Sequence, residues 1–219
     1  MLFIVSTPIG NLKDITLRAI ETLKTVDLIT AEDTRHTKIL LNHYEIPTAL
    51  TSYFEHNESK KVDYLVGLLK EGKNIALVTD AGTPGISDPG YPLIRLAKEN
   101  NIPITVIPGP TAFVAALSLS GLPAHEFIFL GFLPVKSGGR RNKLEELKQE
   151  TRTIIFYESP HRLLKTLKDI EEVMGNPTIV VARELTKKFE EVKAGLAEEI
   201  LEHFTRHPPR GEFVVLIKR

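Results

Sequence analysis

Short apolar runs rich in β-branched residues alternate with longer amphipathic stretches along the first half of the chain. The runs predict strands at Leu2–Ser6, Asp27–Thr30, Ala49–Tyr53, Asn74–Thr79 and Ile104–Ile107. The amphipathic stretches between them predict helices at Thr16–Thr25, Thr34–His43, Ser59–Lys70 and Tyr91–Asn100. Strands that alternate with helices of this length indicate an α/β sheet with crossover connections.

The rigid sequence Pro108-Gly109-Pro110 interrupts this pattern and a second series follows it. After a helix of small residues at Thr111–Ser120, strands are predicted at Phe127–Gly131, Thr153–Tyr157, Thr178–Arg183 and Glu212–Ile217. Helices are predicted at Asn142–Glu150, Arg162–Met174 and Ala197–His203. We therefore predict two α/β domains, residues 1–112 and 113–219, with a ligand cleft between them, because clefts between domains are favoured ligand sites.

Composition excludes several classes of protein. The 219 residues include 28 basic and 28 acidic side chains, and zero net charge counts against non-specific coating of nucleic acid while leaving room for a local basic patch. The absence of cysteine excludes thiol catalysis and disulfides. The histidines show no ligand spacing, so no metal site is predicted. No apolar run approaches the roughly 20 residues of a membrane span, and we expect a soluble, cytoplasmic protein.

The loop that follows the first strand, Ser6–Leu12, lies where ligands bind in α/β sheets. A phosphate cradle at this position needs backbone N–H groups, and Pro8 removes one of them. Neither G-x-G-x-x-G nor G-x-x-x-x-G-K-[ST] occurs in the chain, which disfavours dinucleotides and nucleoside triphosphates. A tight turn without a ligand remains the alternative for this loop.

The loop Thr79–Gly90 is the most unusual of the chain, with three glycines and two prolines within nine residues. It follows a continuous apolar strand, so Asp80 stands at a strand's carboxyl end. Asp80 and the loop carbonyls offer negative potential, which favours a cationic ligand without phosphate. The alternative is that Asp80 and Asp88 are ordinary turn or cap residues.

Other polar clusters also follow predicted strands. Glu32 and Arg35 stand near the end of the second strand, where Asp33 or Thr34 is also suited to cap the next helix. Residues 135–143 contain four positive and no negative charges, and we expect a flexible loop that contacts a phosphate backbone or, alternatively, is only solvated. Two further strands end in charged clusters, at residues 157–162 and 182–188.

Together these loops resemble the 16S ribosomal RNA (cytidine-2′-O)-methyltransferases of the tetrapyrrole methylase superfamily. The resemblance extends from Phe3 to about Glu191 in the same order. The motifs are Thr7–Leu12 with Asp14–Thr16, Ala31–Arg35, Asp80–Pro84 with Ile86–Gly90, Pro108–Pro110, Gly131–Pro134, Tyr157–Arg162 and Arg183–Lys187.

The resemblance implies S-adenosylmethionine as methyl donor, a homodimer, and a substrate in the decoding region of 16S rRNA, within the small ribosomal subunit. S-adenosylmethionine is a sulfonium without phosphate, as the Asp80 loop favours. The residues that the resemblance places around the donor are Pro8, Asp80, Gly82, Thr83, Ile86, Thr111, Ala112 and Tyr157.

Methyl transfer to oxygen is an in-line displacement that needs no nucleophilic side chain, but a general base would activate the ribose hydroxyl. Candidate bases are Glu32, Glu158, Glu184 and Lys187. Candidate RNA contacts are Arg35, Lys136, Arg140, Arg141 and Arg162. We expect that replacing Arg140 and Arg141 together weakens RNA binding and leaves donor binding intact.

Three alternatives remain at this stage. The same fold could methylate a tetrapyrrole carbon or a modified protein histidine, and the basic segment 136–143 favours RNA over both. A non-enzymatic nucleoside-binding module would use the same donor loops without turnover. An RNA-binding protein without chemistry fits poorly with zero net charge.

Overall fold

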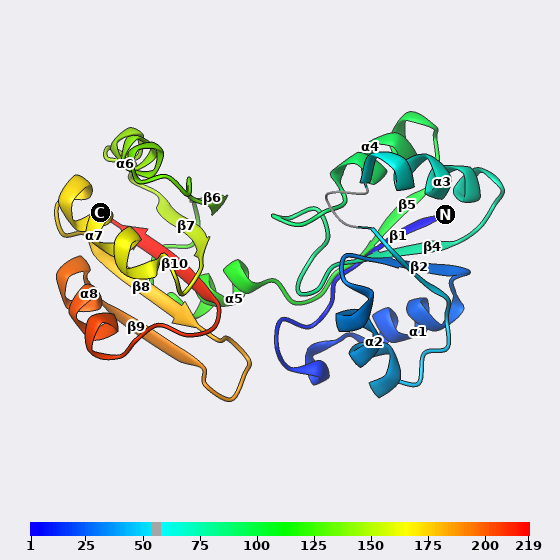
Figure 1. The fold of residues 1–219 in the computed structure, drawn as a ribbon, viewed down its shortest axis with the longest axis horizontal. Helices are drawn as coiled ribbons and strands as arrows, with labels where there is room; N and C mark the ends of the chain where they lie inside the picture. The colour runs from blue at the N-terminus through cyan, green and yellow to red at the C-terminus, as the bar shows by residue number, and fades with distance from the viewer. Residues whose placement is uncertain (54–57) are drawn as a thin grey trace. The chain divides into compact units, whose positions relative to one another are not determined.

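A computed structural model describes residues 1–53 and 58–219 of the chain. The chain divides into two compact units, Met1–Thr111 and Ala112–Arg219, each with one five-stranded sheet (Figure 1). The prediction of two α/β domains is confirmed at the level of fold class. The described residues contain no helix that is long and apolar enough to span a membrane.

The sheet of unit 1 is parallel and has the order β3-β2-β4-β1-β5. Its strands are β1 (Leu2–Val5), β2 (Leu28–Ala31), β3 (Leu50–Ser52), β4 (Ile75–Val78) and β5 (Ile104–Ile107). Its helices are the short 3₁₀ helix η1 (Leu12–Asp14) and α1 (Leu17–Thr25), α2 (Thr34–His43), α3 (Glu58–Lys70) and α4 (Tyr91–Glu99).

Helices cover both faces of this sheet, which explains why its central strand is apolar throughout. Ala76 and Val78 of β4 pack in the core beneath α1 and α2. Ile75 and Leu77 alternate with them and pack in the core beneath α3 and α4. With both faces buried, the polar residues near β4 gather in the loop that follows its carboxyl end.

The sheet of unit 2 is mixed and has the order β6-β7-β10-β8-β9. Its strands are β6 (Phe127–Phe132), β7 (Thr153–Glu158), β8 (Thr178–Arg183), β9 (Glu191–Leu196) and β10 (Phe213–Lys218). Only β6 and β7 pair in parallel; the other pairs are antiparallel. The helices are α5 (Ala112–Ser120), α6 (Ser137–Glu146), α7 (Leu163–Met174) and α8 (Ala197–Arg206).

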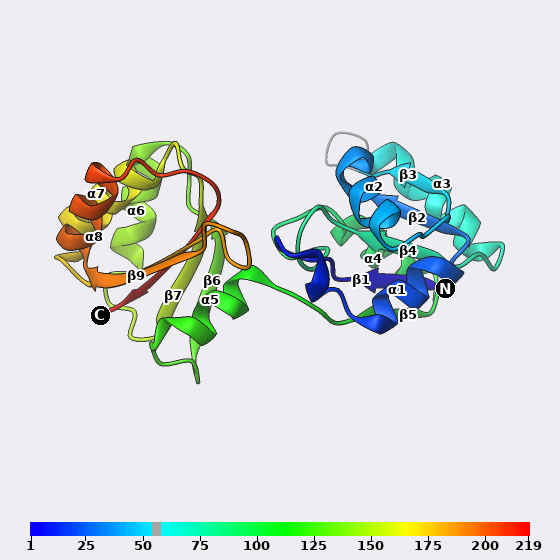
Figure 2. The ribbon, with the colours of Figure 1, turned by 90° about the horizontal axis from the view of Figure 1, so that it is seen from below.

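The two faces of the second sheet are covered differently. Alternate residues of its central strands, such as Phe156 and Val215, form the main core with α6, α7 and α8. The other face is crossed by α5, which contacts β7, β8, β9 and β10 (Figure 2). A single short helix covers that face only in part, and large apolar side chains of α5 and β6 remain exposed.

Unit 2 differs from the sequence prediction at two places. β9 was not predicted, because its sequence Glu-Val-Lys-Ala-Gly-Leu is an exposed edge strand without an apolar run. The segment 135–143, expected to be a flexible loop, contains the start of α6, which begins five residues before the predicted helix. Arg140 and Leu144 of α6 are buried, so tertiary packing holds this turn in place despite the two glycines, Gly138 and Gly139.

Candidate active site

Three loops of unit 1 meet at the carboxyl edge of its sheet. They follow the neighbouring parallel strands β4, β1 and β5, whose carboxyl ends lie at the same edge. Thr7 and Gly82 exchange two backbone hydrogen bonds of 2.8 and 3.1 Å, which join the first loop to the second. Motifs separated by more than 70 residues in the chain are therefore in direct contact.

A chain of three hydroxyl groups links all three loops. The Oγ of Ser6 lies 2.8 Å from Oγ1 of Thr83, which lies 3.0 Å from Oγ1 of Thr111. Each hydroxyl has one proton to donate. Two hydrogen bonds use two of the three protons, so one of the three hydroxyls retains a proton that it can donate to a ligand. Thr83 and Thr111 were predicted; Ser6 was not, and its only sequence signal is a polar residue directly after an apolar strand.

Glycine is required where these loops pass each other. A Cβ atom on Gly109 would lie 3.0 Å from the Cβ of Ser6, which is too close for an ordinary contact. Gly82 has φ of +85°, a left-handed conformation that glycine adopts without strain. Pro8 is buried within the first loop, whereas Ile86 is 40% exposed in the second, and Ala112 begins α5.

Carboxylates gather beside the ends of β2 and β4. The hydroxyl of Thr79 donates a 2.8 Å hydrogen bond to Oε2 of Glu32, and the backbone N–H of Asp33 donates one of 3.0 Å to Oδ1 of Asp80. Burial, together with the negative charges of Glu32 and Asp80, raises the pKa of Asp88 to about 7. The sequence suggested only a turn or cap role for Asp88. Its raised pKa could not be predicted, because the sequence does not show that Glu32 lies near it.

Arg35 is paired within its own helix turn. Its side chain is 90% exposed and lies 2.8 Å from Asp33, whose carboxylate also accepts from the backbone N–H of Arg35 at the start of α2. Hydrogen bonds from Arg35 lower the pKa of Asp33 to about 2. Asp33 is thus the cap of α2, and its charge offsets that of Arg35.

Glu158 lies at the end of β7 in unit 2 and is fully enclosed. Its oxygens accept hydrogen bonds from the backbone N–H of Ser159 at 2.8 Å and the hydroxyl of Thr166 at 2.6 Å. Arg162 lies 3.2 Å from the same carboxylate and donates to the carbonyl of Leu133 at 2.7 Å. Both residues therefore connect β7 to the start of α7. The neighbouring Tyr157 is half-buried and packs edge-on against the rings of Phe129 and Phe132.

The structure corrects the interpretation of Arg140 as an RNA contact. Its guanidinium is 4% exposed and lies 2.6 Å from Asp169 of α7, so it forms an internal ion pair. Arg141 also binds Asp169, at 3.0 Å, but is 40% exposed. Lys136, at the start of α6, is exposed and has no ion pair within the described part of the chain. Of the basic segment, Lys136 and Arg141 face solvent, and Arg140 does not.

Glu184 and Lys187 form a cluster at the end of β8. The ammonium of Lys187 lies 3.0 Å from Glu184 and 2.7 Å from Glu212. Burial disfavours the charge of Lys187, but its hydrogen bonds to these two carboxylates outweigh that effect and raise its pKa. Burial likewise opposes the charge of Glu184, yet Lys187 lowers the net pKa of Glu184. Lys187 is therefore an ammonium group and not a proton acceptor.

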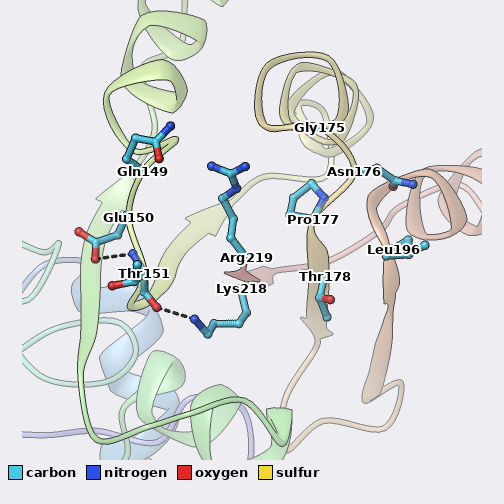
Figure 3. Close-up of a pocket in the computed structure, with 10 residues that line it drawn as sticks. All are labelled: Gln149, Glu150, Thr151, Gly175, Asn176, Pro177, Thr178, Leu196, Lys218 and Arg219. Carbon is cyan, nitrogen blue, oxygen red and sulfur yellow. Dashed lines mark hydrogen bonds between the residues drawn. The ribbon is translucent and has the colours of Figure 1, made fainter.

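An open hollow in unit 2 contains none of the predicted site residues (Figure 3). It lies at the opposite edge of the sheet from Glu158 and Glu184, where β7 and β8 begin and β10 ends. Lys218 donates to the carbonyl of Thr151 within it. The lining residues are Gln149, Glu150, Thr151, Gly175, Asn176, Pro177, Thr178, Leu196, Lys218 and Arg219.

Comparison with known proteins defines the class of protein. Residues 1–201 match the sequence model of the Tetrapyrrole (Corrin/Porphyrin) Methylases. The fold agrees with that of a cobalt precorrin-4 methyltransferase (TM-score 0.74, 20% identity, 99% of this chain and 94% of that one). It also agrees with that of a uroporphyrin-III C-methyltransferase from Thermus thermophilus complexed with S-adenosylhomocysteine. Here the TM-score is 0.68 and the identity 18%, over 100% of this chain and 97% of that one. The chain belongs to the tetrapyrrole methylase family.

Within this family, relatives of much higher identity are named ribosomal RNA small subunit methyltransferase I. The protein of Thermotoga maritima is 49% identical over 99% of this chain and 97% of its own length. The protein of Escherichia coli O157:H7 is 50% identical over 99% of this chain and 77% of its own length. The protein of Synechocystis sp. is 51% identical over 99% of this chain and 78% of its own length. The resemblance inferred from the sequence motifs is confirmed.

Proposed function

We propose that this chain transfers a methyl group from S-adenosylmethionine to the 2′-hydroxyl of a cytidine ribose in the decoding region of 16S rRNA. The observation that supports this most strongly is the identity of about 50%, over nearly the whole chain, to proteins named ribosomal RNA small subunit methyltransferase I. The tetrapyrrole methyltransferases share the fold at about 20% identity, which leaves their acceptors without support here.

The loops of unit 1 fit the proposed donor chemically. They offer hydroxyl groups and carboxylates, and a phosphate-binding glycine motif is absent from the sequence. Glu32, Asp80 and Asp88 complement a ligand with a positive sulfonium and an ammonium group. The close passage of Gly109 and Ser6 holds the first and third of these loops against each other. The residues of unit 1 proposed to hold it are Pro8, Asp80, Gly82, Thr83, Ile86 and Thr111; for Ala112 and Tyr157, which belong to unit 2, a donor contact stays a prediction of the sequence motifs.

S-adenosylmethionine supplies an electrophilic methyl group when it is bound. The protein must then hold the ribose hydroxyl in line with that methyl group, and such positioning lowers a barrier by roughly 7–11 kcal/mol. It must also exclude water, which competes as acceptor. A nucleophilic side chain is not required, in keeping with a chain that has no cysteine.

Among the four candidate bases, Glu32 has the most suitable environment. The carboxylate of Glu158 is enclosed and accepts hydrogen bonds from Ser159 and Thr166, Lys187 is an ammonium, and the pKa of Glu184 is lowered. Glu32 is partly exposed at a strand's carboxyl end and is oriented by the hydroxyl of Thr79. We propose that its carboxylate accepts the proton of the ribose hydroxyl.

The proposed RNA contacts are the cations that face solvent. Lys136 directly precedes α6, Arg141 lies on α6, and Arg35 lies on α2. Phosphate contacts of this kind position RNA without selecting its sequence. Arg162 is already engaged with Glu158 and the Leu133 carbonyl, so we propose for it an indirect role in fixing the start of α7.

We also propose that two copies of the chain associate through the face of unit 2 that α5 crosses. Val114 and Leu119 of α5 are 48% and 55% exposed, and Phe127 and Phe132 of β6 are 40% and 55% exposed. Exposed apolar patches of this kind are typical of protein interfaces. The proposed enzyme acts on the small ribosomal subunit and therefore in the bacterial cytoplasm.

The function is tested by transfer of labelled methyl groups from S-adenosylmethionine. Small ribosomal subunits that lack native modification, naked 16S rRNA and a tetrapyrrole precursor are offered in parallel. Label in RNA, with subunits as the better substrate, supports the proposal. Label in the tetrapyrrole alone contradicts the acceptor, and donor binding without transfer to any of the three favours a nucleoside sensor.

A further inference from the structure

The hairpin between β8 and β9, residues 184–190, is held in a defined conformation. Glu184 and Thr186 have left-handed φ values of 49° and 67°. The carboxylate of Glu190 accepts from the backbone N–H of Thr186 at 2.5 Å, and Lys187 joins Glu184 to Glu212. Backbone bonds from Lys187 to Glu184 and from Glu190 to Lys187 close two successive turns. The loop is thus preorganised by its own polar groups.

This ordered loop presents an aromatic ring to solvent. Phe189 is 64% exposed, although a phenylalanine of a folded domain normally contributes most of its area to a core. The ammonium of Lys188 lies 5.7 Å from the centre of its ring. The two neighbours in the chain therefore combine an apolar π-face with a positive charge.

The charges around the ring favour an anionic partner. Two acids are paired with cations, Glu184 with Lys187 and Glu191 with Arg183 at 3.4 Å, whereas Glu190 accepts only from the backbone N–H of Thr186 and keeps its charge. The exposed cations Lys188, Lys193 and Arg210 make no ion pair among the described residues. Arg210 is tied to the end of β8, because Nε of Arg183 donates to its carbonyl at 2.8 Å.

We propose that Phe189 is a stacking platform for one unpaired nucleobase of the RNA substrate, and that Lys188, Lys193 and Arg210 contact the flanking phosphates. Unpaired bases stack on exposed aromatic rings in RNA-binding proteins, and adjacent cations hold the backbone. The platform rests on the proposed function, because it requires an RNA substrate. It adds a base contact to the phosphate contacts of the three cations.

The test compares binding of two labelled probes to the full-length protein by fluorescence anisotropy. One probe is a dodecamer of cytidines, and the other is an abasic ribose-phosphate oligomer of the same length. Phe189→Ala and Phe189→Leu should weaken binding of the cytidine probe about 5- to 150-fold, the usual contribution of one stacked base, and Phe189→Trp should retain it. Binding of the abasic probe should not change. Lys188→Gln should weaken both probes equally.

A matched control is Tyr64→Ala on α3. Tyr64 is 53% exposed and also has a lysine over its ring, with Lys61 Nζ at 5.1 Å, but it lies outside the hairpin. This variant should bind both probes like the wild type. Equal loss in Tyr64→Ala and Phe189→Ala would show that any exposed ring contributes, and would overturn the assignment of a specific platform.

Three further results would overturn the proposal. The first is unchanged cytidine binding by Phe189→Ala. The second is equal loss of the abasic probe, which would assign Phe189 to the fold of the hairpin. The third is a Phe189→Ala variant that sediments as a smaller species than the wild type, which would place the ring between two copies of the chain. If the wild type methylates no RNA, the proposed function fails. The comparison of the two probes still shows separately whether Phe189 binds an unpaired base.

Discussion

The hydroxyl of Thr79 donates a 2.8 Å hydrogen bond to the carboxylate of Glu32, and this bond joins the carboxyl ends of β4 and β2. The two residues are 47 positions apart, and the parallel pairing of Ala31 with Val78 brings them together. The bond fixes Glu32 beside Asp80 and Asp88 at the edge of the sheet where the motif loops meet. The proposed base is therefore oriented before substrate binds.

Glu32→Gln should lower kcat for methyl transfer about 10²–10⁴-fold, because the amide cannot accept the ribose proton. Donor affinity, measured by calorimetry, should fall far less than kcat, because Asp80 and Asp88 remain to complement the positive charge of the donor. Glu99→Gln, a change of the same type at an exposed position of α4, is the control. An activity of Glu32→Gln close to that of the wild type would remove Glu32 from the mechanism.

Asp88 should make stability fall as pH rises from about 4 to 7. Its pKa is about 7 in the folded protein and near 3.8 in the unfolded chain. Between these values the folded state binds more protons than the unfolded state, so the free energy of unfolding decreases with pH. Asp88→Asn removes this dependence. The measurement is the urea concentration at the midpoint of unfolding, for the variant and for the wild type. The variant's midpoint minus that of the wild type should increase from pH 4.5 to pH 8. A difference that stays constant would contradict the raised pKa.

Arg140→Ala and Arg141→Ala should have different effects, contrary to the common role expected from the sequence. Removing Arg140 leaves Asp169 buried without its closest partner and should destabilise the protein by about 3–5 kcal/mol. Removing the more exposed Arg141 should cost less than about 1 kcal/mol and should weaken RNA binding. Urea unfolding and RNA titration measure the two effects. Equal destabilisation by both variants would refute the distinction.

Leu119→Glu should disrupt the proposed dimer, because it places a charge on the exposed apolar surface of α5. Sedimentation should then show monomers where the wild type sediments as dimers. Leu17→Glu is a matched control, since Leu17 is 79% exposed at the start of α1 in unit 1. A wild type that is monomeric at micromolar concentration would contradict the dimer.

The sequence predicted most helices and strands because local signals coincide with the tertiary fold. Asp33 and Thr16, for example, accept hydrogen bonds from the first turns of α2 and α1, where the helices were expected to begin. The motif loops were also located, since each follows an apolar strand. In these regions the amino-acid pattern and the packing favour the same structure.

The features that were missed depend on contacts between distant residues. The first turn of α6 forms despite its glycines, and its Arg140 is paired with Asp169, 29 residues away in the chain. β9 pairs only with β8 at the edge of the sheet, so it needs no apolar run. The raised pKa of Asp88 comes from burial, from Glu32 in a distant segment of the chain, and from Asp80 at the start of its own loop. Composition and periodicity do not predict contacts between residues that are distant in the chain.

The most direct test of the proposed function is nucleoside mass spectrometry of 16S rRNA after reaction with labelled S-adenosylmethionine. Small subunits without native modification are the substrate, and the Glu32→Gln variant is run in parallel. The account predicts labelled 2′-O-methylcytidine from the wild type and about 10²–10⁴-fold slower labelling from the variant. Label on a base, on another nucleoside or on a subunit protein would contradict it.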